Sequence, residues 1–369
     1  MRMRVRRLLA LLLLILALAP GTWLREGQAP RRDETAAVRF TRLPLPAGAD
    51  VAAHLGAFTL EAAWEMTGTF SGFGSYSALL PRPDGRLMAI SDSGRYLTFA
   101  PPGVPSGAPS GASPGASSGV PAAAPESGSV VPEPLRRRRD LDIEAAAQDP
   151  AGDTIWLARE DSNGISRHDP AFRDAGAYVR PAAMRGWRRN RGPEAMARLA
   201  DGRFIVLQEG FAGLFAMRRH HAVLFARDPL RGGPAMEFTF AGPLAFDPTD
   251  MAQLPDGRVL ILMRRLVWPL PLRFSGRIVV ADPAAIRPGA PWRGHVAARL
   301  TAPLPVDNFE GLAIVPGRDG RVTVWMISDA NNAATQRTLL WKMTVDPARL
   351  PGARKKARSS PSRPHAQPG

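Results

Sequence analysis

The stretch MAQLPDGRVLILM, residues 251–263, sets a pattern that recurs along the chain. Two apolar runs, Met251 to Leu254 and Val259 to Met263, flank Asp256-Gly257. This arrangement predicts a β-hairpin, because glycine accepts the positive φ that a tight turn needs. A third apolar run, Ile278 to Ala281, follows this hairpin. Four similar hairpins are predicted around Asp84-Gly85, Gly152-Asp153, Asp201-Gly202 and Asp319-Gly320.

Repeated antiparallel units of this kind predict an all-β fold, and their spacing indicates a β-propeller in which each unit is one blade. Residues 36–66 and 337–346 are left over at the two ends of the repeat. We expect them to join in one ring-closing blade, which covers strand edges that would otherwise be exposed. With that blade the count is six, and seven remains open. Two packed β-sheets are the alternative architecture.

Composition sets the limits of the folded domain. The chain has 369 residues, 45% of them hydrophobic, and no cysteine. This excludes a disulfide scaffold, cysteine-ligated zinc and a cysteine nucleophile. Residues 101–134 are rich in Pro, Gly, Ser and Ala, and predict a disordered insertion. Residues 351–369 predict a disordered basic tail, so we expect the propeller to span residues 36–347.

The N-terminus has the pattern of a targeting segment. Arg2, Arg4, Arg6 and Arg7 precede an apolar run of 12 residues from Leu8 to Ala19. That run suits a signal peptide within residues 1–30 and is shorter than the roughly 20 residues that span a bilayer. An uncleaved N-terminal anchor is the alternative. In either case we expect a periplasmic or secreted monomer that contacts a membrane only through an uncleaved N-terminus.

The formal net charge of +15 does not predict nucleic-acid binding. The positive charge is concentrated in residues 1–32, in Arg136–Arg139 and in residues 351–369, whereas the rest of the chain is formally neutral. These segments are expected to be removed or disordered, and no aromatic platform accompanies them. Two Gly-x-Ser-x-Gly patterns in residues 111–119 lie in the predicted insertion, outside the strand-turn-helix context that a hydrolase nucleophile needs.

Acidic residues recur at fixed positions of the predicted hairpins. Because the start of one strand lies beside the end of the next in a hairpin, both acidic sets are expected at one end of the blades. Crowded carboxylates must raise their pKa values, pair with arginine or bind a cation. The starts of the first strands carry Glu144, Glu194, Asp250 and Glu310. The ends of the second strands carry Asp92, Glu160, Glu209 and Asp329, with Arg264 at this position of the fourth hairpin.

Two interpretations of these carboxylates remain open: a salt-bridged ring that joins the blades, or a cation-assisted binding or hydrolytic site at the mouth of the central channel. Oxygen ligands without cysteine or paired histidine favour Ca²⁺ over zinc. The predicted metal ligands are Glu194 and Glu310, followed by Asp92 and Asp329. The predicted substrate-binding residues are Arg191, Arg337 and Asn308. The two arginines are expected to bind the anionic group of the substrate. No catalytic residue is assigned.

Taken together, several motifs resemble the phytase-like domain, whose bacterial members are described as having esterase-like activity of the phytase family. The resemblance covers about residues 65–345 and implies an exported bacterial β-propeller with Ca²⁺-dependent hydrolysis of a phosphate or carboxylate ester. A weaker similarity to Ca²⁺-dependent lactonase propellers rests on Pro193-Glu194 and Glu310-Gly311. The motifs are Ile90-Ser91-Asp92-Ser93-Gly94, Gly192-Pro193-Glu194-Ala195, Asp247-Pro248-Thr249-Asp250-Met251, Asp307-Asn308-Phe309-Glu310-Gly311, Ile327-Ser328-Asp329 and Gln336-Arg337-Thr338.

The chain departs from this pattern after Asp329. It has Ala330-Asn331-Asn332 where many relatives carry a second acid, which argues against a tight multi-cation site. Two functions therefore stay open. One is a Ca²⁺-assisted esterase or phosphoesterase acting on a small molecule. The other is a non-catalytic propeller that binds a small ligand or a cell-envelope partner.

Overall fold

The computed structural model describes residues 37–70, 72–103, 124–132, 141–188, 191–210, 219–267, 273–330 and 336–353. The predicted signal peptide, Arg136–Arg139, Asn331-Asn332, most of the predicted insertion and nearly all of the predicted tail lie outside these ranges. Within the described ranges, no helix combines the length and the apolar character needed to cross a membrane.

The strands form five antiparallel units. The first consists of β3 (Tyr76–Pro81), β4 (Leu87–Ser91), β5 (Arg95–Phe99) and β6 (Glu126–Ser129). The second consists of β7 (Ile143–Gln148), β8 (Ile155–Arg159), β9 (Gly164–His168) and β10 (Ala177–Val179). The third consists of β11 (Pro193–Arg198), β12 (Phe204–Gln208), β13 (Arg219–Phe225) and β14 (Ala235–Ala241).

The fourth unit consists of β15 (Asp247–Gln253), β16 (Val259–Val267), β17 (Arg273–Ala281) and β18 (Pro291–Leu300). Its outer strand β18 pairs in parallel with β14 of the third unit. The fifth consists of β19 (Asn308–Pro316), β20 (Val322–Asp329) and β21 (Thr338–Val345), extended by β2 (Thr59–Gly68) and β1 (Val38–Arg42). The only α-helix of the described residues, α2 (Ala49–Leu55), packs against the outside of the ring through Leu55.

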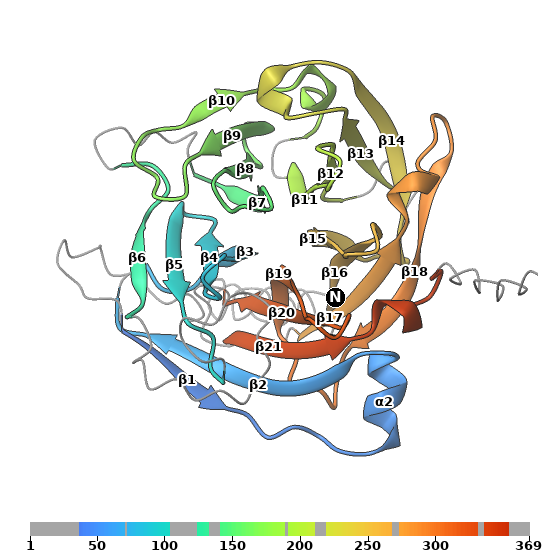
Figure 1. The fold of residues 1–369 in the computed structure, drawn as a ribbon. Coiled ribbons are helices and arrows are strands. Elements are labelled where there is room, and N and C mark those ends of the chain that lie inside the picture. Colours follow the sequence, from blue (N-terminus) through green and yellow to red (C-terminus); the bar gives the residue numbers. More distant parts are fainter. Residues whose placement is uncertain are drawn as a thin grey trace, which may run out of the picture.

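These units are the blades of a β-propeller (Figure 1). The first strand of each blade, namely β3, β7, β11, β15 or β19, lies nearest the axis, and consecutive inner strands contact one another around the whole ring. The predicted propeller is therefore confirmed, but the described strands form five blades and the expected count of six is wrong.

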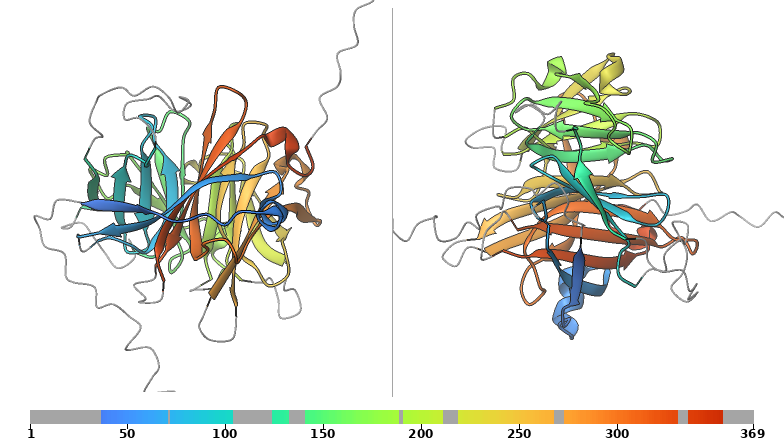
Figure 2. Two further views of the ribbon diagram at one scale, coloured as in Figure 1. Left: turned by 90° about the horizontal axis from the view of Figure 1, so that it is seen from below. Right: turned by 90° about the vertical axis from the view of Figure 1, so that its left-hand side faces the viewer.

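The count differs because one blade has two roles. The predicted joining of the two chain ends is confirmed, since β2 pairs antiparallel with β21. However, β21 also pairs with β20 of the fifth hairpin, so the ring-closing blade and the fifth hairpin are the same blade. Figure 2 shows β1 and β2, in blue, along the outer edge of this blade.

The predicted insertion is partly ordered. Glu126–Ser129 forms β6 and pairs with β5, so the expectation of disorder is wrong for these residues. A small residue in this outer strand is required by packing, because a Cβ on Gly128 would lie 2.7 Å from the Tyr96 hydroxyl. The tail also begins in an ordered state, since the Pro351 carbonyl accepts a hydrogen bond of 2.7 Å from Arg258.

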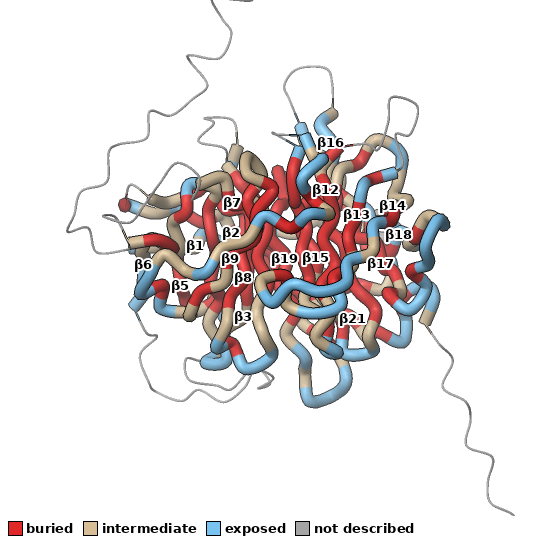
Figure 3. The backbone as a smooth tube through the Cα atoms, turned by 90° about the horizontal axis from the view of Figure 1, so that it is seen from above, coloured by how far each residue is buried: buried red, intermediate tan, exposed pale blue. Residues whose placement is uncertain are grey.

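Five buried apolar clusters hold the blades together, one at each contact between neighbours. The largest lies between the fourth and fifth blades and includes Leu262, Phe309 and Trp341. Figure 3 shows these buried residues in the middle of the strands and the exposed residues toward the loops. The core thus runs between the blades, which leaves both ends of the inner strands free to carry other side chains.

The hairpin turns fix which end is which. Gly85, Gly202, Gly257 and Gly320 have φ between 79° and 90°, and the aspartate before each one accepts the N–H of the arginine that follows it at 3.0 to 3.1 Å. The sequence Asp-Gly-Arg therefore builds the turn, as the pattern predicted. All five turns lie after inner strands, so all inner strands begin at the opposite end of the ring.

Candidate functional site

Every inner strand has a β-bulge near its start. The register shifts skip one residue in each of β3, β7, β11, β15 and β19. A bulge leaves its extra residue unpaired in the ladder and re-aims the side chain, so these five residues are equivalent positions of the five blades. They are Ser77, Glu144, Glu194, Thr249 and Glu310.

The two hydroxyl residues join neighbouring blades. Ser77 Oγ donates a hydrogen bond to the Ile143 carbonyl, and Thr249 Oγ1 donates to the Phe309 carbonyl at 3.2 Å. Each acceptor immediately precedes the bulged glutamate of the next blade. Because a carboxylate has no proton to donate, glutamate cannot form this link when it is ionised.

Glu310 forms a compact ion pair with the fourth blade. The Arg264 guanidinium donates to Glu310 and, at 2.8 Å, to Asn308 Oδ1. Asn308 Nδ2 in turn donates to Glu310 Oε1 at 2.6 Å. Arg264 also lies 3.7 Å from a Glu209 oxygen. The neighbouring carboxylates raise the pKa of Arg264 although burial opposes this, so it stays charged.

Glu194 lies in a different situation. Its side chain is 5% exposed, and it forms no hydrogen bond or ion pair with any residue that the structure describes. One carboxylate oxygen from each of Glu160, Glu194 and Glu209 lies within 4.8 Å of the others, and the same holds for Asp142, Glu144 and Glu160. The two groups share Glu160, so together they make one five-carboxylate arrangement.

We use the term carboxylate cluster for these residues with their electrostatic neighbours. Burial is the largest cause of their pKa shifts, and the like charges around them act in the same direction. The pKa of Glu194 and Glu144 is raised well above its ordinary value, that of Glu160 to about 7 and that of Asp92 to about 6. The members are Asp92, Asp142, Glu144, Glu160, Glu194, Glu209 and Glu310.

The family model described as phytase-like, with the esterase-like activity of phytase, matches residues 71–332. The chain belongs to the phytase-like family. No curated protein sequence matches it. Among solved structures, this phytase-like propeller is similar to a gluconolactonase of Xanthomonas campestris, with 12% identity, 88% of this chain and 99% of that chain covered, and a TM-score of 0.38.

A second solved structure is a luciferin-regenerating enzyme, with 10% identity, 84% of this chain and 95% of that chain covered, and a TM-score of 0.40. A third comes from a nidogen/laminin complex, with 10% identity, 82% and 96% covered, and a TM-score of 0.40. At these identities and TM-scores the likenesses do not bear on what the phytase-like propeller does.

The structure brings three of the four predicted metal ligands near one another. Glu310 and Asp92 both raise the pKa of Glu144, and Glu310 also raises that of Glu194. Asp329 is buried and lies opposite Asn308 in the ladder, outside both groups of close carboxylates. The role of these residues as metal ligands stays a prediction.

The predicted substrate-binding residues separate in the phytase-like propeller. The Arg191 charge lowers the pKa of Glu209, so Arg191 lies beside the carboxylate cluster. Arg337 lies 3.9 Å from both Glu65 and Asp307, neither of which belongs to the carboxylate cluster. Asn308 is fully buried between Arg264 and Glu310, which indicates that it positions these two side chains.

Sequence reasoning placed Asp250 in the acidic set, and this assignment is wrong. The bulge shifts the register by one residue, so Thr249 takes the equivalent position. Asp250 is instead buried and accepts N–H groups from Met251 at 2.7 Å and Leu312 at 2.6 Å, with a further backbone hydrogen bond from Leu79. It links inner strands of three blades.

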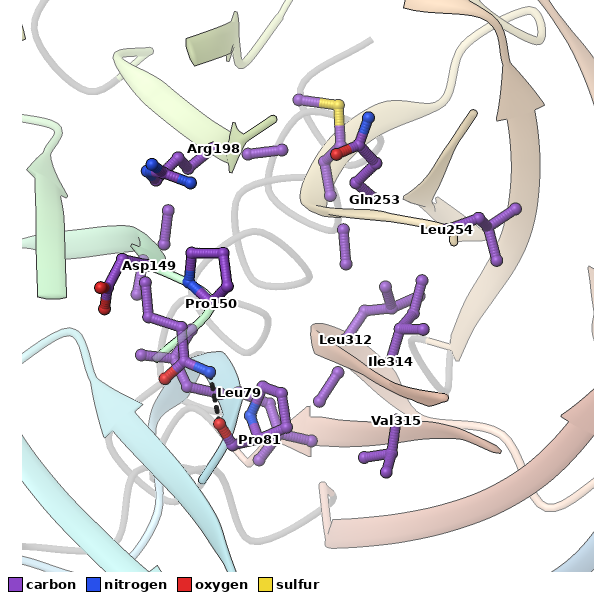
Figure 4. Close-up of a pocket in the computed structure, with 18 of the residues that line it drawn as sticks. Leu79, Pro81, Asp149, Pro150, Arg198, Gln253, Leu254, Leu312, Ile314 and Val315 are labelled. Carbon is purple, nitrogen blue, oxygen red and sulfur yellow. Dashed lines mark hydrogen bonds between the residues drawn. The ribbon is translucent and has the colours of Figure 1, made fainter. Parts of the chain in front are cut away.

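The other end of the inner strands lines an open, mostly apolar cavity of about 500 Å³ (Figure 4). Leu79, Leu312 and Ile314 lie around it, and Arg198 and Asp149 lie toward its edge. Leu79 and Leu312 donate to Asp250, so this carboxylate lies between the cavity and the starts of the inner strands. The two ends of the phytase-like propeller thus differ in chemistry.

The carboxylate cluster predicts how stability depends on pH in the metal-free protein. A carboxyl group whose pKa is raised by folding binds its proton more tightly when folded, so its stabilising effect is complete below about pH 4 and is lost as pH rises through the folded pKa. With pKa values of about 6 for Asp92 and about 7 for Glu160, the melting temperature in chelator should fall between pH 5 and pH 8. Glu160→Gln should flatten this decline. A wild-type melting temperature that rises over this range, or an unchanged slope in the variant, would contradict it.

Proposed function

We propose that this phytase-like propeller is an exported hydrolase of ester or phosphoester bonds that acts with a divalent cation, Ca²⁺, at the carboxylate cluster. The observation that carries the proposal is Glu194: a carboxylate that is 5% exposed, has no hydrogen bond or ion pair with a described residue, and lies among further carboxylates with only the more distant Arg264 charge to oppose them. Burying an unpaired carboxylate is costly unless it is protonated or holds a cation.

The donor set fits a hard cation. Glu160, Glu194 and Glu209 offer one oxygen each within a 4.8 Å group, and Ca²⁺ prefers several carboxylate oxygens. Glu310 is a poorer ligand than the sequence suggested, because Arg264 and Asn308 both donate to its Oε1 and Arg264 already balances its charge. A bound cation would supply a Lewis acid that polarises the ester or phosphoryl oxygen and lowers the pKa of a bound water.

The chain's own residues would do the remaining chemistry. Glu144 is only partly buried by exposed area, and burial together with neighbouring carboxylates raises its pKa, so it suits a general base that takes a proton from water. Arg264 holds Glu310 and lies near Glu209, and this fixes one side of the cluster. Export is supported by the sequence of residues 1–30 alone.

The direct test is hydrolysis of p-nitrophenyl acetate, p-nitrophenyl butyrate and p-nitrophenyl phosphate by the full-length mature protein. We expect turnover of one of these classes in Ca²⁺, its loss in EGTA, and its return when excess Ca²⁺ is added. Equal rates in Ca²⁺ and EGTA would overturn the role of the cation.

A non-catalytic ligand-binding propeller is the second candidate, and the apolar cavity at the other end of the inner strands favours it. It predicts a higher melting temperature in Ca²⁺ with no turnover of any of the three substrates. The same two measurements therefore separate the candidates.

A further inference from the structure

Three arginines lie close together on the fourth blade, two of them against one aromatic ring. Phe246 is 3% exposed, and the guanidinium carbons of Arg265 and Arg277 lie 4.8 and 4.6 Å from the centroid of its ring. Arg299 lies directly opposite Arg277 in the pairing of β17 with β18. We call Arg265, Arg277 and Arg299 the arginine cluster. It carries three positive charges on adjacent strands.

No carboxylate in the part of the chain that the structure describes compensates this charge. Among the described residues, none of the three arginines forms an ion pair, and the charges of Arg299 and Arg265 add to burial in lowering the pKa of Arg277. Elsewhere in the propeller, arginines meet acids: Arg167 lies 2.7 Å from Asp228. Like charges directly opposite each other on neighbouring strands are destabilising, so the arginine cluster is unfavourable in the absence of an anion.

Two of the three guanidinium groups, those of Arg265 and Arg277, are held in place by the contacts that follow. Arg277 donates to the Gly276 carbonyl at 2.7 Å and to Ser275 Oγ at 3.2 Å. The contacts with Phe246 orient Arg265 and Arg277 about the same ring. Fixed guanidinium groups lose little further entropy when they bind an anion, which favours binding.

The arginine cluster and Arg264 lie on opposite faces of the fourth blade. Successive strand residues point to opposite sides of a sheet, so Arg264 faces Glu310 of the fifth blade while Arg265 faces the third blade. Phe246 packs in the core between the third and fourth blades, which agrees with this direction. Glu310, which accepts a hydrogen bond from Arg264, is therefore on the other side of the fourth blade from the arginine cluster. Glu209 of the third blade lies 3.7 Å from Arg264 and forms no ion pair with Arg265, Arg277 or Arg299.

We propose that the arginine cluster is a binding site for a multivalent oxyanion, such as a phosphate or sulfate group on a small molecule. Guanidinium groups match the paired oxygens of oxyanions through two parallel hydrogen bonds. Three neighbouring positive charges favour a dianion over a monoanionic carboxylate. This site is separate from the carboxylate cluster and does not depend on the proposed hydrolysis.

The test uses inorganic phosphate as the probe, with ionic strength held constant by NaCl. Arg299→Gln removes one charge of the cluster, and Arg293→Gln, at an exposed position of the same strand, is the matched control. We expect phosphate to raise the melting temperature of the wild type and of Arg293→Gln. Arg299→Gln should bind phosphate about tenfold more weakly, because it loses a charged hydrogen bond.

A second readout separates binding from a structural role. Without phosphate, Arg299→Gln should melt at a higher temperature than the wild type, since it relieves repulsion from Arg277; Arg265→Gln should behave in the same way. Three results would overturn the proposal: no phosphate effect on the wild type, equal phosphate affinity in Arg299→Gln and Arg293→Gln, or a lower melting temperature of both cluster variants without phosphate. Retention of the phosphate effect in Glu194→Gln is expected, whatever the outcome for Ca²⁺.

Discussion

Glu194→Gln is expected to abolish the response of the propeller to Ca²⁺ while leaving the metal-free protein at least as stable as the wild type. The side chain is buried without a hydrogen bond or ion pair to a described residue, so its negative charge destabilises the fold unless a bound cation balances it. Glutamine has nearly the same shape but carries no charge. The substitution should therefore remove a ligand and, at the same time, a buried charge.

The size of the effect follows from mass action. At a Ca²⁺ concentration 100 times the dissociation constant, the wild type should gain about 2.7 kcal/mol of unfolding free energy. Mutating a residue that only hydrogen-bonds to a metal ligand lowers metal affinity by up to about 100-fold. Losing a direct ligand should therefore weaken Ca²⁺ binding by at least about 100-fold. At the same Ca²⁺ concentration the gain would then be about 0.4 kcal/mol or less, and hydrolysis should fall in parallel.

The matched control is Glu237→Gln, at an exposed position of β14 whose side chain lies in the outer part of the third blade. Thermal and urea unfolding with and without Ca²⁺ are the measurements. If Glu194→Gln kept the full Ca²⁺ response, the cation would not be bound through this residue. If it strongly destabilised the metal-free protein, Glu194 would be structural.

Arg264→Met should give the largest loss of stability. It would leave Glu310, whose side chain is 8% exposed, with only Asn308 as a hydrogen-bond partner. Breaking a buried ion pair on one side costs about 3 kcal/mol or more, because the remaining charge is uncompensated. Arg264→Lys should lose less, since it keeps the charge but replaces the planar guanidinium whose Nη1 donates to both Glu310 and Asn308.

The double variant Arg264→Met/Glu310→Gln checks the cause. Because it removes both charges, it should recover much of the stability lost in Arg264→Met, and urea unfolding of the four proteins gives the coupling free energy. Equal losses in the single and double variants would mean that Arg264 stabilises the propeller through packing. A large coupling would confirm it as the internal counter-charge of the cluster.

The hairpins were predictable because their information is local. Each Asp-Gly turn is written in two or three adjacent residues, and the apolar runs beside it, such as Val259 to Met263, form the strands that were expected. The number of blades could not be predicted from local sequence. It depends on whether β21 pairs with β20, with β2, or with both, and no short stretch of sequence records that choice.

The site was predictable only in outline. The acids before and after the hairpins converge because hairpin geometry requires it, which is why Glu194, Glu160 and Glu209 could be grouped. A bulge changes the side-chain direction by one residue and leaves no mark in the sequence, so Asp250 was placed wrongly. The importance of Arg264 had a signal: it takes the position where other blades carry an acid.

The pairing of β2 with β21 makes the first and last parts of the ring depend on each other. β2 ends at Gly68, and β21 begins at Thr338, so nearly the entire domain must be synthesised before this contact can form. Contacts between such distant segments are slow to form because a long loop must close first. A nascent chain would remain an open arc until its final strands emerge. Deleting either β2 or β21 would remove the pairing that closes the ring.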